Sequence, residues 1–141
     1  MPAPLDELRD ASVGAGRVAL TWIGQAGFGI RTRETTALID PFLAPYQGRR
    51  YESSFSPASV TGVDVVLCTH EHLDHFDGAS APAIASASPS AVFVVPTPIV
   101  DMVTESGIAA DRVIGMQPDE VVEIAGLSIR AVPAKHPGRS G

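Results

Sequence analysis

The sequence has a single cysteine, ten lysine and arginine residues in total, and no long apolar run. One cysteine excludes a disulfide within the chain, so we expect Cys68 to be a small core residue. No segment approaches the roughly 18–20 apolar residues of a transmembrane helix, and the start lacks a signal peptide's features, so we expect no membrane span and a cytoplasmic location. The net charge of −6 disfavours a nucleic-acid partner, because affinity for phosphate backbones comes largely from clustered basic residues.

What the chain does contain is enough apolar sequence for one core, with 45% hydrophobic residues in 141. Short apolar runs alternate with helical segments, which predicts a layered α/β domain. Two helices are expected, over residues 77–88 with Asp77 as cap and over residues 97–105. The expected strands are residues 17–23, 27–32, 36–40, 63–68, 91–95, 113–116, 120–124 and 127–132.

Histidine is also scarce, yet three of the four histidines lie in one stretch, residues 70–75, with the sequence HEHLDH. The stretch follows an apolar run that is expected to be a buried strand. Residues two apart in extended backbone share a face, so His70 and His72 can converge on one ion. Asp74 and His75 follow a turn and can aim at a second position, roughly 3.5–4 Å from the first.

A single histidine at the end of a strand is more often a surface residue than a metal ligand. Three imidazoles and an aspartate in six residues would be costly to desolvate without a cation, so the cluster predicts a metal site. Glu71 and Leu73 alternate with the ligands and are expected to face elsewhere.

The pattern His70-x-His72-x-Asp74-His75 resembles the HxHxDH signature of the metallo-β-lactamase superfamily. Residues 22–28, WIGQAGF, followed by residues 37–41, ALIDP, are similar to the opening strands of the branch that contains L-ascorbate-6-phosphate lactonase and N-acyl-phosphatidylethanolamine phospholipase D. The resemblance implies a layered αββα sandwich, of which residues 1–141 would form the N-terminal half within a single domain. Many members of that branch carry a histidine at the position of Gln25.

The resemblance also implies a ligand set. His70, His72 and His136 would hold one ion, and Asp74 and His75 would hold the other. His136 follows a Pro-Ala pair after an expected strand, where relatives supply the third ligand of the first ion. Imidazole and carboxylate ligands without a thiolate cluster suit one or two zinc ions, and manganese or iron could occupy the same set.

Asp40 ends an expected strand and precedes Pro41, which is typical of a turn-forming aspartate. The resemblance places it below the histidine-rich loop. Metal-bound imidazoles usually donate their second N–H to a carboxylate or carbonyl, so Asp40 is expected to support a ligand rather than to be one.

A metal-bound water would lose a proton near neutral pH and attack a carbonyl or phosphorus. The prediction is therefore a hydrolase of small-molecule esters, lactones, amides or phosphodiesters, in which Asp74 orients the water. A non-catalytic metal-binding or partner-binding half-domain and a nuclease are the alternatives. Arg49 and Arg50 lie in a polar loop that is either solvated or turned to the substrate.

Members of the resembling family have two similar β-rich halves, and the second half supplies a bridging aspartate and a further histidine. We expect this chain to be the first half of a longer protein, and the alternatives are a half-domain that pairs with another chain and a degenerate metal-binding remnant. A homo-oligomer is the partner arrangement left open. Expressed alone, it is expected to fold poorly and to lack activity, because an apolar sheet face would be uncovered.

Overall fold

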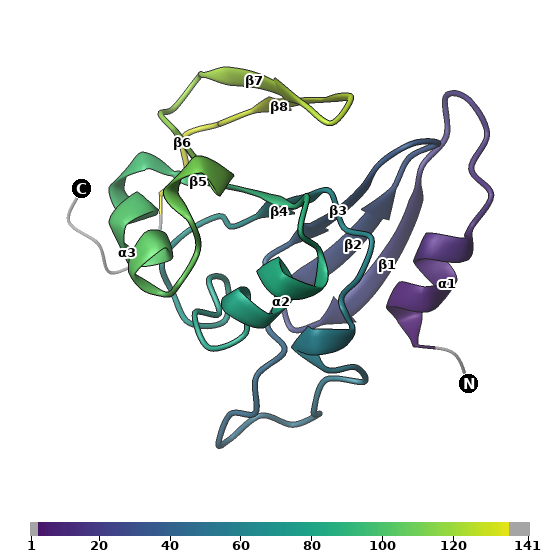
Figure 1. The fold of residues 1–141 in the computed structure, drawn as a ribbon, viewed down its shortest axis with the longest axis horizontal. Helices are drawn as coiled ribbons and strands as arrows, with labels where there is room; N and C mark the ends of the chain where they lie inside the picture. The colour runs from purple at the N-terminus through teal and green to yellow at the C-terminus, as the bar shows by residue number, and fades with distance from the viewer. Residues whose placement is uncertain (1–2, 136–141) are drawn as a thin grey trace.

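A computed structural model describes residues 3–135 of the chain, and it is built around one mixed sheet of six strands in the order β1-β2-β3-β4-β5-β6 (Figure 1). The first three strands pair antiparallel, and β3 to β6 pair parallel. β1 therefore runs in the same direction as β3 to β6, and the turn after β1 lies at the edge where the carboxyl ends of β3 and β4 meet. The strands are β1 Ala19–Gly24, β2 Gly27–Arg31, β3 Thr36–Ile39, β4 Val65–Leu67, β5 Val92–Pro96 and β6 Val113–Met116.

Helices cover one face of this sheet. They are α1 Pro4–Asp10, α2 Ala81–Ala87 and α3 Val100–Glu105, with short 3-10 helices η1 Pro57–Ser59, η2 Thr97–Ile99 and η3 Ala110–Arg112. Their apolar side chains pack on the inward side chains of alternate strand positions, and this main core includes Leu5, Leu8, Leu38, Val66, Ile84, Phe93 and Val103. Within residues 3–135, no helix is long and apolar enough to cross a membrane.

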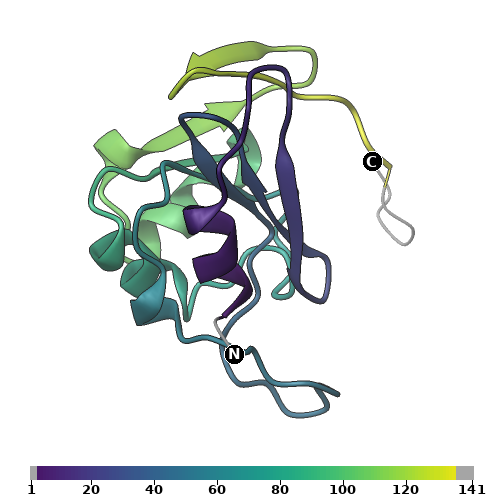
Figure 2. The ribbon, with the colours of Figure 1, turned by 90° about the vertical axis from the view of Figure 1, so that its right-hand side faces the viewer.

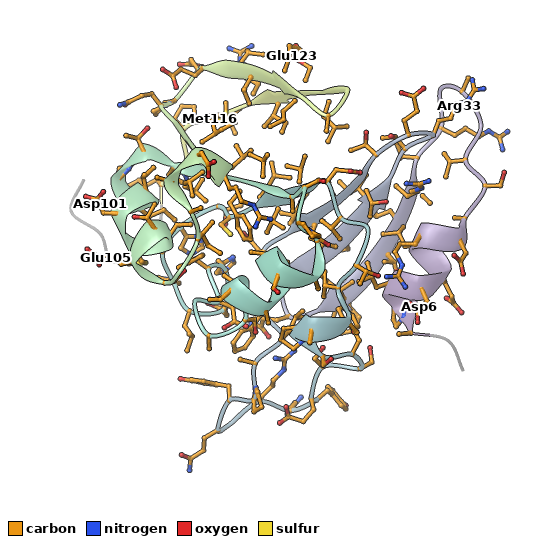
Figure 3. The ribbon with its side chains drawn as sticks, in the orientation of Figure 1. Asp6, Arg33, Asp101, Glu105, Met116 and Glu123 are labelled. Carbon is orange, nitrogen blue, oxygen red and sulfur yellow. The ribbon has the colours of Figure 1, made fainter. Side chains whose placement is uncertain are left out.

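A hairpin covers part of the opposite face. Strands β7 Val121–Ile124 and β8 Leu127–Arg130 pair antiparallel as a separate sheet. In Figure 2 the hairpin lies at the top of the view, apart from the helices. It packs on Met116 and the neighbouring β3 to β5 side chains, while Glu123 stands on its outer side (Figure 3).

The β1–β2 end of that second face is uncovered. Leu20 is 63% exposed and Trp22 is 59% exposed. Trp22 pairs with Phe28 across the two strands, so their side chains share one face, which is the face that the hairpin covers further along. An apolar strip is therefore open to solvent at this edge of the sheet.

All eight predicted strands and both predicted helices are present, and every element except the strand over residues 113–116 has shifted ends. The strand expected over residues 63–68 is reduced to Val65–Leu67. The helix expected from Asp77 begins at Ala81, because residues 77–80 form a turn in which the Ser80 N–H donates to the Asp77 carbonyl oxygen at 3.1 Å. Helix α1 was not predicted, and its two buried leucines attach it to the sheet.

Candidate metal centre

The histidine-rich loop begins where β4 ends, at the carboxyl edge of the parallel strands. Its backbone is not extended. The N–H groups of His75 and Phe76 both donate to the His72 carbonyl oxygen, at 2.9 and 2.8 Å, which closes a turn over residues 72–76. The extended backbone expected for His70 and His72 is therefore wrong, because strand geometry ends before the first histidine, whereas the turn expected before Asp74 and His75 is present.

The turn nevertheless gathers the predicted side chains. The His70 and His72 rings meet edge to face with centroids 4.7 Å apart, and the His70 and His75 centroids are 3.9 Å apart. The Nε2 atom of His75 lies 3.6 Å from Oδ2 of Asp74. Three imidazoles and one carboxylate thus share a small region at the edge of the sheet.

Asp40 holds the His75 imidazole in position. It follows β3, is 3% exposed, and has a positive φ of 46°, which aspartate tolerates better than most residues. Its Oδ1 accepts the Thr69 backbone N–H at 2.7 Å, and its Oδ2 accepts the Thr69 hydroxyl at 2.7 Å. Oδ2 also lies 2.7 Å from Nδ1 of His75, an arrangement that orients the ring and leaves Nε2 as its outward nitrogen.

Gln25, in the turn between β1 and β2, reaches the same loop. Its side-chain amide donates to Oδ2 of Asp74 at 3.3 Å. The turn itself is held by the Trp22 indole N–H, which donates to the Gln25 carbonyl oxygen at 2.8 Å. A residue from the first hairpin therefore contacts the acidic residue of the motif.

Asp77 anchors the other side of the loop, and the sequence indicated only a helix cap there. This buried carboxylate accepts the backbone N–H groups of Leu43 and Ala44, at 3.0 and 2.9 Å, together with the Ser80 hydroxyl at 2.5 Å. It joins the end of the motif loop to the segment that follows Asp40. Its position two residues after His75, at the end of the motif, was the available sequence signal.

Cys68 lies beneath the loop and does not open onto it. It is 7% exposed, as expected for a small core residue. Burial raises the pKa of the thiol far above its ordinary value, and the negative charges of Asp40 and Asp77 raise it further. The thiol is therefore neutral at physiological pH and is not an activated nucleophile.

The donor set suits a divalent transition ion, because it combines imidazoles with a carboxylate and one imidazole is already oriented by Asp40. Within residues 3–135, no three histidine, cysteine, aspartate or glutamate side chains converge as a ready-made ligand group. His136, the predicted third ligand of the first ion, lies outside the described residues. The ligand assignment stays a prediction.

A mixed sheet with helices on one face and a histidine-rich loop at the carboxyl edge of its parallel strands defines the metallo-β-lactamase class of fold. Comparison with known proteins gives the family: residues 19–141 match the Beta-lactamase superfamily domain, and the chain belongs to that family. The resemblance and the α/β fold class predicted from the sequence are both confirmed.

Several relatives carry functional names. The chain is 31% identical over 127 residues to a "UPF0173 metal-dependent hydrolase" of Polynucleobacter asymbioticus, covering 86% of this chain and 42% of that protein. It is 30% identical over 79 residues to a "Probable L-ascorbate-6-phosphate lactonase" of Salmonella heidelberg, covering 55% of this chain and 22% of the relative. The chain thus spans less than half of either relative.

Among solved structures, the fold matches a "possible metal-dependent hydrolase" from Veillonella parvula with a TM-score of 0.62 and 28% identity. That match covers 79% of this chain and 46% of the other. Igni18, a metallo hydrolase from Ignicoccus hospitalis, matches with a TM-score of 0.59 and 25% identity, covering 87% and 51%. The chain therefore corresponds to one part of a larger fold in both structures.

Proposed function

We propose that this chain is the part of a metal-dependent hydrolase that supplies the first ligands of its metal centre. The substrate class is a small-molecule ester, lactone or phosphodiester. The observation that carries the proposal is the loop at the end of β4, where one short turn brings His70, His72 and His75 together and Asp40 orients the last of them. Family membership supports it, because relatives are named metal-dependent hydrolases.

The proposed ligands are His70, His72 and His136 for one ion and Asp74 and His75 for a second. Zinc is the ion that this donor chemistry suits best, and manganese and iron are the alternatives. When bound, such an ion lowers the pKa of water and stabilises negative charge that develops on a carbonyl or phosphoryl oxygen.

The chain's own residues would position the reacting groups. The Asp40 carboxylate would accept a hydrogen bond from His75 Nδ1, which keeps the ring in one orientation and presents Nε2 outward. The Asp74 carboxylate, 3.6 Å from that Nε2, would orient the attacking water and accept its hydrogen bond. Gln25 restrains the same carboxylate through its amide.

A hydrolysis assay tests the proposal. The protein that contains this chain is purified and given zinc or manganese, and esters, lactones and phosphodiesters are offered as substrates. We expect metal-dependent turnover of at least one class, at roughly 1 per second or more. Asp74→Asn should lower kcat by about 100-fold or more, since general acid–base groups contribute about 10² to 10⁴.

Leu73→Ala is the matched control, because Leu73 lies in the same turn, is 47% exposed and offers no ligand atom. It should leave turnover within about twofold. A protein that binds metal but turns over none of the three classes would contradict the proposal and favour a binding module.

A further inference from the structure

The connection between β3 and β4, which extends from the bottom of the molecule in Figure 1, carries two adjacent arginines with different surroundings. Arg50 is exposed, whereas Arg49 is half-buried. The Arg49 guanidinium lies over the Phe42 ring, 4.5 Å from its centroid. Its Nε donates to the Tyr51 carbonyl oxygen at 2.7 Å, and its Nη1 donates to that of Ala44 at 3.2 Å. Three contacts thus fix the side chain.

The remaining nitrogen of Arg49 faces the turn between β1 and β2. A Cβ atom at Gly24 would lie 3.3 Å from Nη2, so the guanidinium stands directly beside this turn. The next residue of the turn is Gln25, whose amide donates to Asp74. One turn therefore touches both the arginine and the acidic residue of the motif.

Arg49 is also tied to the motif loop from the opposite side. Asp77, which follows the loop, accepts the backbone N–H of Ala44 at 2.9 Å. The carbonyl oxygen of Ala44 in turn accepts from Arg49 Nη1. The guanidinium is therefore linked to the loop by hydrogen bonds through Ala44 and lies next to the turn that contacts Asp74.

The charge of Arg49 is not matched by any acidic side chain in the part of the chain that the structure describes, residues 3–135. Neither its hydrogen bonds nor the ion pairs of that part join it to a carboxylate, and Nη2 has no hydrogen-bond partner there. The groups that hold the guanidinium, two carbonyl oxygens and an aromatic ring, carry no net charge, so its positive charge remains available to an anion. A guanidinium suits planar or tetrahedral anions because its N–H groups form a rigid fork.

We propose that Arg49 binds an anionic group of the substrate, a phosphate or a carboxylate, beside the metal loop. The inference deepens the proposed hydrolase function by naming a charge that the substrate carries. Phe42 and the carbonyl oxygens of Ala44 and Tyr51 hold the guanidinium, and Nη2 is the atom that meets the anion.

The test is binding of inorganic phosphate and of acetate to the full protein, followed by NMR. We expect saturable shifts of the Arg49 Nε–H and Gly24 N–H signals at concentrations that leave the distant Gly126 N–H unmoved. Arg49→Gln should weaken anion binding by at least about tenfold, because a hydrogen bond that involves a charged group contributes more free energy than one between neutral groups. Arg50→Gln, the matched control at an exposed position, should leave binding within about twofold.

Arg49→Lys is a second variant in case Arg49→Gln does not fold. It keeps the positive charge but loses the paired N–H groups of the guanidinium, so it should also weaken binding. Response to phosphate alone would identify a phosphate-bearing substrate, and response to acetate alone a carboxylate-bearing one. Equal binding by Arg49→Gln and Arg50→Gln, or unshifted Arg49 and Gly24 signals in the unmodified protein, would overturn the proposal and leave Arg49 as a loop support. This measurement of anion binding does not depend on turnover. If the protein hydrolyses no substrate but Arg49→Gln still weakens anion binding, the hydrolase proposal is contradicted and the anion-binding proposal stands.

Discussion

Asp40 connects the end of β3 with the histidine-rich turn. Its two oxygens accept from the Thr69 backbone and hydroxyl and meet His75 Nδ1, each at 2.7 Å. Asp40→Asn keeps the size and the positive φ but loses one acceptor and the charge. We expect metal affinity to fall by about 10- to 100-fold and the free energy of unfolding to fall by about 1–3 kcal/mol.

Asp64→Asn is the control for that substitution. Asp64 also accepts a backbone N–H through its carboxylate, from Thr36 at 2.9 Å, but it precedes β4 and lies away from the metal loop. It should cost stability while leaving metal affinity unchanged, as measured by chemical denaturation and competition with a chelator. A similar loss of metal affinity in both variants would mean that Asp40 affects metal binding only by stabilising the folded protein.

The ligand candidates could be predicted from sequence because four of them lie within six consecutive residues. Asp40 was expected as a support from the resemblance, but the supports from Gln25 and Asp77 could not be predicted. The contact from Gln25 to Asp74 spans 49 positions, and the contact from Leu43 to Asp77 spans 34. No local pattern records such pairs, because they depend on how the strands are brought together at one edge.

Cys68 gives a prediction that depends on burial. Its thiol pKa is raised by burial, with Asp40 and Asp77 adding to the effect, so the thiol stays protonated in the folded protein. In the unfolded chain it ionises above about pH 8.5, and the unfolded state then binds fewer protons than the folded state. Stability should therefore fall as the pH rises above that value.

Cys68→Ala removes this contribution, so the difference in stability between the two proteins should change with pH only above about 8.5. A thiol reagent should react slowly with the folded protein and rapidly in denaturant. Fast modification of the native thiol at neutral pH would show that Cys68 is not held in the core.

At the scale of the element, sequence patterns located the strands better than the turn that carries function. Apolar runs and glycine or polar breaks identified all eight strands, because strand packing leaves a local signature. The turn expected before Asp74 and His75 is present, but the extended backbone expected for His70 and His72 is wrong, because β4 ends at Leu67 and residues 70–72 bend. Helix α1 escaped prediction because only Leu5 and Leu8 of its seven residues are buried.

The edge strand β1 should make the chain self-associate. Leu20 of β1 is 63% exposed, and Val18, just before the strand, is 64% exposed. Among residues 3–135, β1 is the first strand of the sheet and its outer edge is unpaired. Replacing both with threonine keeps a branched side chain suited to a strand and removes apolar surface. We expect less association in sedimentation at a given concentration.

Val121→Thr is the comparison, because Val121 is 56% exposed on the hairpin rather than on β1. It should change association little. If it reduces association as much as the double substitution does, general apolar exposure rather than the β1 face would be responsible.

At the scale of the whole molecule, the two faces of the sheet are covered unequally. The helices cover one face of the sheet and form a continuous core with it. On the other face, the β7–β8 hairpin covers only strands β3 to β6. The chain matches 42% of one named hydrolase and 46% of a solved metal-dependent hydrolase structure. We therefore propose that the open face is completed by further structure in the functional protein, as predicted from the sequence.

The central claim is that the turn after β4 is a metal site, and its most direct test is elemental analysis of the protein purified without chelator. We expect one or two divalent ions per chain, with zinc as the main metal, in line with the donor chemistry. His72→Ala should remove about one ion, since a ligand is lost, while Leu73→Ala should retain the full content. A protein that carries no metal as purified and takes up none from added zinc, or equal metal content in the two variants, would contradict the account.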